Sequence, residues 1–307
     1  MWKAFWRSPL AVVGFLMVIF FLTIGALGPV FLTFLQAISN ALGLGLDLNP
    51  FELDFNDYML PPEPRHPMGT DNYGRDLLSR ILLGANVSLT VSIIVIILGV
   101  PLGIFLGLIS GYYGGAIDEI IMRVTDVFLV FPALILAMAI SASLGAGLYS
   151  AIIAITVVWW PTYVRVVRGQ VLSAKENLYV EAAKAIGLSD IKIMFKHILP
   201  NILSPIVVLV TMDMGSIVLL NAGLSFIGLG AQPPTPEWGR LVYDGLPYFP
   251  EKWWLTIFPG TAVFLTAMGF NLLGDGLNDI LDPRYRRRLE FREKEVAEVE
   301  RKGDTEG

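Results

Sequence analysis

Residues 169–201 read GQVLSAKENLYVEAAKAIGLSDIKIMFKHILPN, and this segment is the most informative part of the chain. Gly187 can adopt a positive φ and end a helix, because it has no Cβ atom. Ser189 or Asp190 can cap a following helix, and Pro200 is expected to stop that second helix. The segment therefore predicts a short helix, a tight turn and a second helix that lie flat on a membrane surface. Before the turn, four small or apolar residues recur at helical spacing: Leu178, Ala182, Ala185 and Ile186.

The chain on either side of this segment contains long stretches without a charged residue. A bilayer core about 30 Å thick needs about 20 apolar residues in a helix and disfavours charge at its centre. The 38 uncharged residues between Asp126 and Arg165 are too many for one span, and the small residues at 141–147 predict a turn between two spans. We therefore expect an all-α membrane protein with six transmembrane helices, at approximately 10–35, 86–110, 124–144, 148–168, 203–225 and 255–278.

The composition agrees with a membrane protein and excludes several functions. Of 307 residues, 54% are hydrophobic and 16% are charged, whereas an ordinary soluble domain has about 25% charged residues. The chain has no cysteine and its two histidines are His66 and His197, so thiolate and multi-histidine metal sites are excluded. No P-loop motif or catalytic constellation occurs, and the net charge of −5 disfavours nucleic acid as a partner. We expect no catalytic residue and no metal ligand.

The distribution of basic residues orients the predicted helices. An even number of spans places both termini on one side, and Lys and Arg are enriched in cytoplasmic loops. With cytoplasmic termini, 17 basic residues lie inside and 5 lie outside. We therefore expect a multi-pass protein of the cell (inner) membrane with both termini in the cytoplasm. A cleaved N-terminal presequence is the alternative, and it would leave five spans.

The EAAKAIG and LPN motifs of the opening segment resemble the EAA loop of ABC importer permeases. That loop has Glu-Ala-Ala, three residues, Gly, and then Leu-Pro twelve and thirteen residues after the glycine, as in this chain. His197 departs from the general pattern, which has isoleucine at this place. The resemblance implies a coupling helix that docks on an ATPase subunit, and small alanines would let that partner approach closely. The residues it assigns to docking are Glu181, Ala182, Ala183, Ala185, Gly187, Leu199 and Pro200.

Three further segments are similar to the second permease subunit of the dipeptide, oligopeptide and nickel family of ABC importers. They are GTDNYGRDLLSRILLGANVSL at 69–89, GLSFIGLGAQPPTPEWG at 223–239 and LNDILDPRYRR at 277–287, and the resemblance covers most of residues 1–288. Asn221 departs from it, because many relatives carry a carboxylate before AGLSF. The resemblance implies the ABC importer permease (MetI-like) fold with a cytoplasmic EAA coupling helix.

The resemblance also implies a function and a set of partners. The chain would be a non-catalytic subunit of an ATP-driven importer and would form a path for peptides with a homologous six-span permease. Two ABC ATPase subunits would use ATP and Mg²⁺, this chain would bind no cofactor, and an extracytoplasmic substrate-binding protein would deliver the cargo. Oligosaccharides and nickel chelates are alternative cargoes, and an ion-coupled secondary transporter is an alternative from another class.

Two residues of the fifth span are candidates for the translocation path, Asp213 and Asn221. An ionisable residue inside a membrane helix is a functional candidate, and for Asp213 a structural polar contact is an equal interpretation. Glycines at 99, 103 and 107 form small-xxx-small repeats that predict close packing of the second span. Pro132 and Pro161 are expected to kink the third and fourth spans.

We expect the chain to divide into four regions. They are an N-terminal cytoplasmic end and first helix at 1–35, an extracytoplasmic loop with a pre-helix at 36–85, a five-helix permease core at 86–280 that contains the EAA loop at 169–202, and a charged cytoplasmic tail at 281–307.

Overall fold

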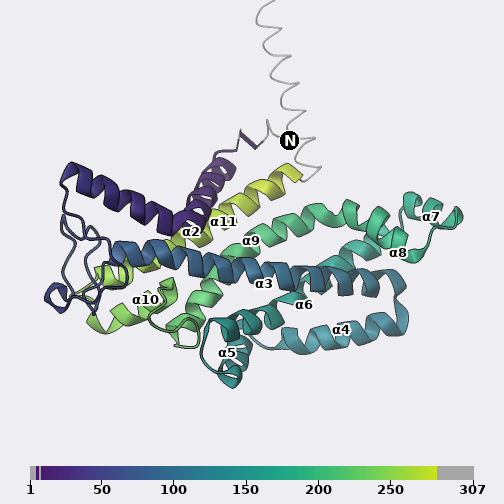
Figure 1. Ribbon diagram of the computed structural model, residues 1–307. Helices are drawn as coiled ribbons and strands as arrows, with labels where there is room; N and C mark the ends of the chain where they lie inside the picture. Colours follow the sequence, from purple (N-terminus) through teal and green to yellow (C-terminus); the bar gives the residue numbers. More distant parts are fainter. Residues whose placement is uncertain (1–4, 7, 282–307) are drawn as a thin grey trace, which may run out of the picture.

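The computed structural model describes residues 5, 6 and 8–281, which form a bundle of helices (Figure 1). Within these residues the only β pairing is an isolated bridge between Thr70 and Asp76. The predicted charged tail lies outside the described residues, except for Leu281. The elements are α2 (Pro9–Leu42), η1 (Phe55–Asp57), α3 (Leu77–Tyr113), α4 (Gly115–Val130), α5 (Ala133–Leu144), α6 (Leu148–Ala174), α7 (Leu178–Ala185), α8 (Asp190–Lys192), η2 (Ile193–Ile198), α9 (Leu199–Phe226), α10 (Trp238–Gly245), η3 (Leu246–Tyr248) and α11 (Trp254–Leu281).

Among the described residues, five helices are long and apolar enough to cross a membrane, and there is a sixth span if α4 and α5 count as one. The five are α2, α3, α6, the helix from Asp190 to Phe226, and α11. α4 and α5 pass the same test together but are bent by 91° at their junction. Phe131 is extended, as a residue before proline prefers to be, and Pro132 has no N–H with which to continue α4. The predicted kink at Pro132 is therefore a full break in the third span, whereas α6 continues past Pro161.

The helix that follows the EAA turn does not stop at Pro200, so that prediction is wrong. The chain is helical without interruption from Asp190 to Phe226. Pro200 is the second residue of α9, where the fixed φ of its ring suits the first turn. The preceding residues, Ile193–Ile198, are π-helical. In this segment an N–H bonds to the carbonyl five residues earlier, as Leu199 N does to Met194 O. With this wider pattern the missing N–H of Pro200 does not interrupt the helix, which continues into the fifth span.

α3 crosses the bundle from one end to the other (Figure 1). Asp76 caps its first turn, because the Asp76 Oδ2 atom accepts a hydrogen bond from Ser79 N at 2.7 Å. The pre-helix expected within 36–85 is thus the beginning of α3 itself. We call the end of the bundle with α7, α8 and the last turn of α3 the EAA end. The far end holds the loop 43–76 and α10.

α3 packs against α6 along a line of glycines. A Cβ atom on Gly103 would lie 2.4 Å from the Cβ of Tyr163, and one on Gly107 would lie 2.7 Å from the Cβ of Val167. On Gly99 it would have 3.9 Å to the nearest atom. The predicted close packing is confirmed for Gly103 and Gly107, whereas Gly99 has room for a side chain.

The apolar core is divided among the two ends and the middle of the bundle. A cluster at the far end includes the buried indoles of Trp238 and Trp254. A second cluster joins α3, α6 and α9 to the EAA loop through residues such as Val171, Val180 and Ile193. A third lies between α3, α5, α6 and α9. The EAA loop is thus packed onto the bundle as part of its core.

Candidate functional site

The short helix α7 presents an uncovered apolar stripe at the EAA end. Leu178 is 81% exposed and Ile186 is 75% exposed, and Ala182 and Ala185 are exposed beside them. The carboxylate of Glu181 lies in the first turn of the same helix and is also exposed. Burial of such a stripe would be favourable, so the stripe has the character of a docking face.

The opposite side of α7 belongs to the core of the chain. Val180 is fully buried and Ala183 is 4% exposed, and both pack in one cluster with Ile193 and Ile198. Leu199 packs against the same cluster. Of the residues assigned to docking, Ala183 and Leu199 therefore hold the loop on the bundle, whereas Glu181, Ala182, Ala185, Gly187 and Pro200 are exposed. Their roles in docking stay predictions.

The turn after α7 has the geometry predicted for Gly187. This glycine has a φ of 77°, in the left-handed region. Gly187 N donates to Lys184 O at 2.9 Å, and Leu188 N donates to Ala183 O at 3.2 Å. These two bonds are the Schellman motif that closes a helix and satisfies its last carbonyls. The turn fixes the angle between the exposed stripe of α7 and the following helix.

Asp213 lies near the middle of α9 and has a partner on α6. Its Oδ2 atom accepts a hydrogen bond from Trp159 Nε1 at 2.8 Å, and the residue is half-buried. This contact satisfies one carboxylate oxygen and ties the fifth span to the fourth. A structural polar contact is therefore present, and the role of Asp213 in a translocation path stays a prediction.

Asn221 lies in a buried polar cluster that contains an unforeseen residue, Glu237. Asn221 Nδ2 donates to Glu237 Oε1 at 3.1 Å, and Ser88 Oγ donates to the same oxygen at 3.0 Å. Glu237 also caps α10 by accepting from Arg240 N at 3.0 Å. The carboxyl is fully buried, and this burial raises its pKa above the usual range. One carboxyl thus joins α3, α9 and α10, and the place of Asn221 on a path stays a prediction.

Sequence reasoning missed Glu237 because it stands in a proline-rich loop that looks exposed. The available signal was Ser88, a serine in the apolar second span, because glutamate is not among the residue types favoured at a helix N-cap. The distance of 149 residues between Ser88 and Glu237 explains why no local pattern joins them.

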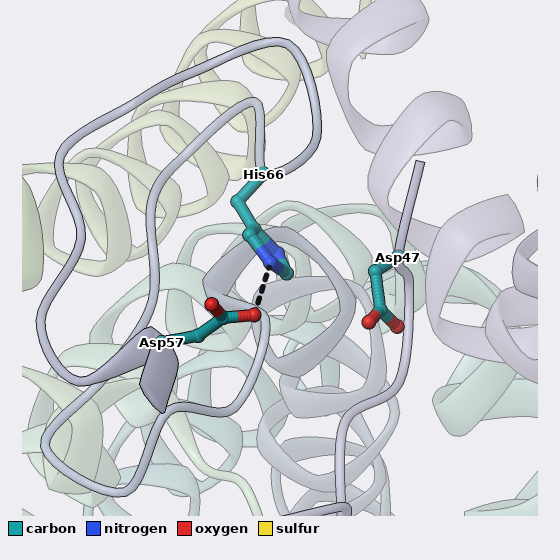
Figure 2. Close-up of side chains that lie close together, drawn as sticks. All are labelled: Asp47, Asp57 and His66. Carbon is teal, nitrogen blue, oxygen red and sulfur yellow. Dashed lines mark hydrogen bonds and ion pairs between the residues drawn. The ribbon is translucent and has the colours of Figure 1, made fainter. Parts of the chain in front are cut away.

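Three potential metal ligands meet in the far-end loop (Figure 2): Asp47, Asp57 and His66 have ligand atoms within 4.8 Å of one another. The side chain of Arg65 already supplies a cation there, with its Nη atoms 3.1 Å from Asp47 Oδ2 and 3.2 Å from Asp57 Oδ2. The cluster is therefore compensated by the chain itself.

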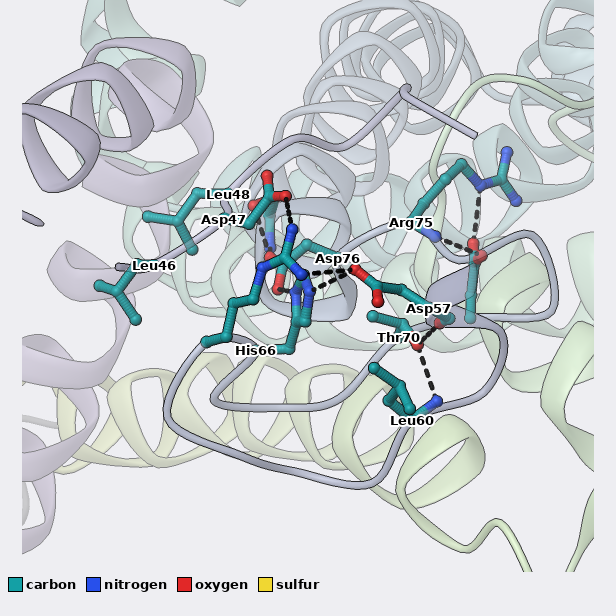
Figure 3. A network of polar contacts seen from close by, with 12 residues as sticks. Leu46, Asp47, Leu48, Asp57, Leu60, His66, Thr70, Arg75 and Asp76 are labelled. Atoms are coloured by element: carbon teal, nitrogen blue, oxygen red, sulfur yellow. Dashed lines mark hydrogen bonds and ion pairs between the residues drawn. The ribbon is translucent and has the colours of Figure 1, made fainter. Parts of the chain in front are cut away.

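His66 is the centre of this far-end network (Figure 3). The imidazole is 2% exposed, with Nδ1 3.1 Å from Asp76 Oδ1 and Nε2 3.4 Å from Asp57 Oδ2. Thr70 Oγ1 donates to Asp57 O and accepts from Leu60 N. The network fastens the loop to the residue that caps α3, so the loop is anchored to the start of that helix.

The long apolar helices and the core-anchored EAA loop at one end are typical of the membrane permease subunits of ABC transporters. Residues 99–287 match the family described as "Binding-protein-dependent transport system inner membrane component". The chain belongs to this family. Its fold is similar to a chain of the methionine ABC transporter MetNI in an inward-facing conformation, with a TM-score of 0.52 and 20% identity over 65% of this chain and 94% of that chain.

Curated relatives match most of the chain. It is 43% identical to the probable D,D-dipeptide transport system permease protein DdpC of Escherichia coli K12, over 77% of this chain and 79% of the relative. It is 39% identical to the dipeptide transport system permease protein DppC of Alkalihalophilus pseudofirmus, over 91% of this chain and 88% of the relative. It is 44% identical to the glutathione transport system permease protein GsiD of Escherichia coli O6, over 76% and 77%.

Proposed function

We propose that this chain is a non-catalytic transmembrane subunit of an ATP-driven importer of peptides. The observation that supports peptides as the cargo is the set of relatives, which are named for dipeptide, D,D-dipeptide and glutathione transport. These names favour peptides over the oligosaccharides and nickel chelates that the resemblance also allowed. The exposed stripe of α7 supports an ATPase partner.

The EAA end faces the cytoplasm in this proposal, with both chain termini on that side. The excess of basic residues expected there supports this orientation. Two ATPase subunits bind ATP and Mg²⁺ and receive α7 through its stripe, and this chain binds neither. A homologous six-span permease completes the translocation path. A substrate-binding protein delivers the peptide to the far-end loops, which face away from the cytoplasm.

The mechanism follows from how the EAA loop is held. Closure of the ATPase subunits on ATP moves α7, and the core cluster beneath Val180 and Ala183 transmits this movement to α3, α6 and α9. Because a packed core resists compression, the helices shift as bodies and the shared path opens alternately to the two sides.

Two neighbouring alanines provide the test. Ala182 is exposed on the stripe and Ala183 is buried beneath it. A tagged wild-type chain should co-purify with two ATP-binding polypeptides and a second permease. Ala182→Asp should abolish ATPase capture but leave the chain folded and inserted, whereas Ala183→Asp should reduce the amount of folded chain. Full ATPase capture by the Ala182→Asp variant would contradict the docking role.

A further inference from the structure

The last turn of α3 is held by the EAA loop through Tyr112. The Tyr112 hydroxyl donates a hydrogen bond to Asp190 Oδ1 at 2.7 Å. The Lys184 ammonium lies 5.4 Å from the centre of the Tyr112 ring, within the range of a cation–π contact. Lys184 lies in α7 and Asp190 begins α8, so one side chain of α3 contacts the loop on both sides of its Gly187 turn.

A second polar contact joins the beginning of the EAA loop to the last turn of α3. Lys175 Nζ donates to Gly111 O at 3.0 Å. This carbonyl is in the last turn of α3, where the helix dipole favours a cation. Tyr112 also packs against the cluster that contains Val180 and Ile193. The loop therefore grips the end of α3 through a hydrogen bond, a cation and apolar packing.

The other end of α3 is fastened to the far-end loops. Arg80 Nη1 donates to Pro50 O at 3.0 Å, and the indole of Trp238 in α10 donates to Ile81 O at 2.9 Å. Ser88 of α3 binds the buried carboxyl of Glu237. These contacts attach both the loop 43–76 and α10 to the first four turns of the helix.

The span between these two attachments is one helix. α3 has 37 residues and is therefore about 55 Å long at about 1.5 Å per residue. Pro101 removes one backbone hydrogen bond inside it, but α3 continues through this proline without a break. A displacement of one end of the helix is therefore passed on to the other end. The glycine line at Gly103 and Gly107 lets α3 lie directly against α6, which guides that displacement.

We infer that Tyr112 is a positioning residue that fastens the EAA loop to α3. Through this contact α3 transmits movement from the ATPase subunits to the far-end loops. The inference rests on the proposed function, and it adds a route and a residue to it. When the ATPase subunits move α7, the hydroxyl of Tyr112 transfers that movement to α3. The loop 43–76 and α10, which the far end of α3 holds, then change position on the side where cargo arrives.

The test uses the adjacent tyrosine as a matched control. Tyr113 is 47% exposed, and its ring stands edge-on to that of Tyr112 with ring centroids 5.3 Å apart. The complete importer with Tyr112→Phe or Tyr113→Phe is reconstituted in proteoliposomes, and peptide uptake and ATP hydrolysis are measured together. Tyr112→Phe should lower the peptide taken up per ATP by about fivefold, as expected for the loss of one hydrogen bond. Tyr113→Phe should leave this ratio unchanged.

The partner side of the bond supplies a rescue. Asp190→Asn keeps an oxygen that can accept from the Tyr112 hydroxyl, whereas Asp190→Ala does not. We expect a normal ratio for the first variant and a reduced ratio for the second. A purely structural role would lower the amount of assembled complex, with uptake and hydrolysis falling in parallel and their ratio unchanged. That pattern would overturn the inference.

A spin label tests the transmission of movement through α3 without a measurement of transport. The chain has no cysteine, so Phe55→Cys, at an exposed position of the far-end loop, can carry a single label in a complex with cysteine-free partners. ATP should change the spectrum of the label in the Tyr113→Phe background, and this change should be about fivefold smaller with Tyr112→Phe. Equal spectral changes in both backgrounds would refute the transmission of movement through Tyr112 and α3. A normal spectral result without peptide uptake would refute only the proposed cargo.

Discussion

Arg168 of α6 holds Asp118 of α4 in a two-pronged ion pair at the EAA end. Arg168 Nε lies 2.5 Å from Asp118 Oδ1, and Arg168 Nη2 lies 2.6 Å from Asp118 Oδ2. Ser110 of α3 donates a further bond to Asp118 Oδ1 at 2.5 Å. A planar guanidinium and a carboxylate match in this geometry, so the pair fixes orientation as well as distance. Asp118 thus joins three helices next to the turn that the EAA loop grips.

Asp118→Asn should destabilise the chain, because it weakens the two charge-assisted bonds. We expect a loss of about 1 kcal/mol, since both side chains are partly exposed and solvent screens part of their attraction. Thermal unfolding in detergent should show a midpoint lower by about 2–4 °C. Glu119→Gln is the control, because the Glu119–Arg123 pair is highly exposed with a separation of 3.7 Å. Equal midpoints for the two variants would contradict the role of Asp118.

The glycine line between α3 and α6 predicts opposite outcomes for two alanine substitutions. Gly107→Ala should destabilise the bundle by about 1–3 kcal/mol, because the new methyl group collides with Val167 and with the α6 backbone. Gly99→Ala should be tolerated, because a Cβ atom there has 3.9 Å to its nearest neighbour. Detergent melting curves measure both, and a similar loss at the two positions would show that the helices do not pack along this line.

The buried carboxyl of Glu237 predicts how stability depends on pH. Burial raises its pKa in the folded protein, so the folded chain binds a proton that the unfolded chain releases above a pH of about 4.3. The stabilisation is complete below that value and is lost as the pH rises through the raised pKa. Glu237→Gln cannot release this proton, so its melting midpoint should decline less between about pH 5 and pH 8 than that of the wild type.

Two comparisons separate this effect from others. Burial also raises the pKa of Asp244, and its contribution is common to wild type and variant. Glu251 is exposed in the same loop, so Glu251→Gln should leave the pH dependence of the wild type intact. Parallel curves for wild type and Glu237→Gln would show that the buried carboxyl does not control stability in this range.

Gly187→Val should uncouple ATP hydrolysis from uptake in an assembled complex. The space around Gly187 is open, but its φ of 77° is costly for a β-branched residue, by about 1–2 kcal/mol. The turn would therefore open and redirect the α7 stripe. Gly187→Asn should be milder, since asparagine tolerates the left-handed region. The readouts are uptake and ATP hydrolysis by equal amounts of complex, and normal coupling in Gly187→Val would exclude a role for this turn.

Much of the fold could be predicted from the spacing of charges. A charge inside the bilayer is costly, so the uncharged stretch between Arg80 and Asp118 indicates the position of α3 directly. The positive φ of Gly187 was also predictable, because the conformation of a helix-ending turn depends mainly on the residues within it.

The incorrect and missing predictions concern properties that depend on distant partners. Pro200 continues a helix because the π-helical residues before it adjust the hydrogen bonding. Nothing local distinguishes Ala182 from Ala183, since the orientation of an eight-residue helix is set by the core beneath it. Glu237 and Tyr112 gained their significance only from partners 149 and 78 residues away.

ATP-driven import of peptides is tested most directly by uptake of a labelled dipeptide into proteoliposomes that contain this chain, its partner permease, two ATPase subunits and the binding protein. We predict uptake that requires ATP and the binding protein and that stops with Ala182→Asp. Uptake by this chain alone, driven by an ion gradient and unaffected by removal of ATP, would contradict the proposed function.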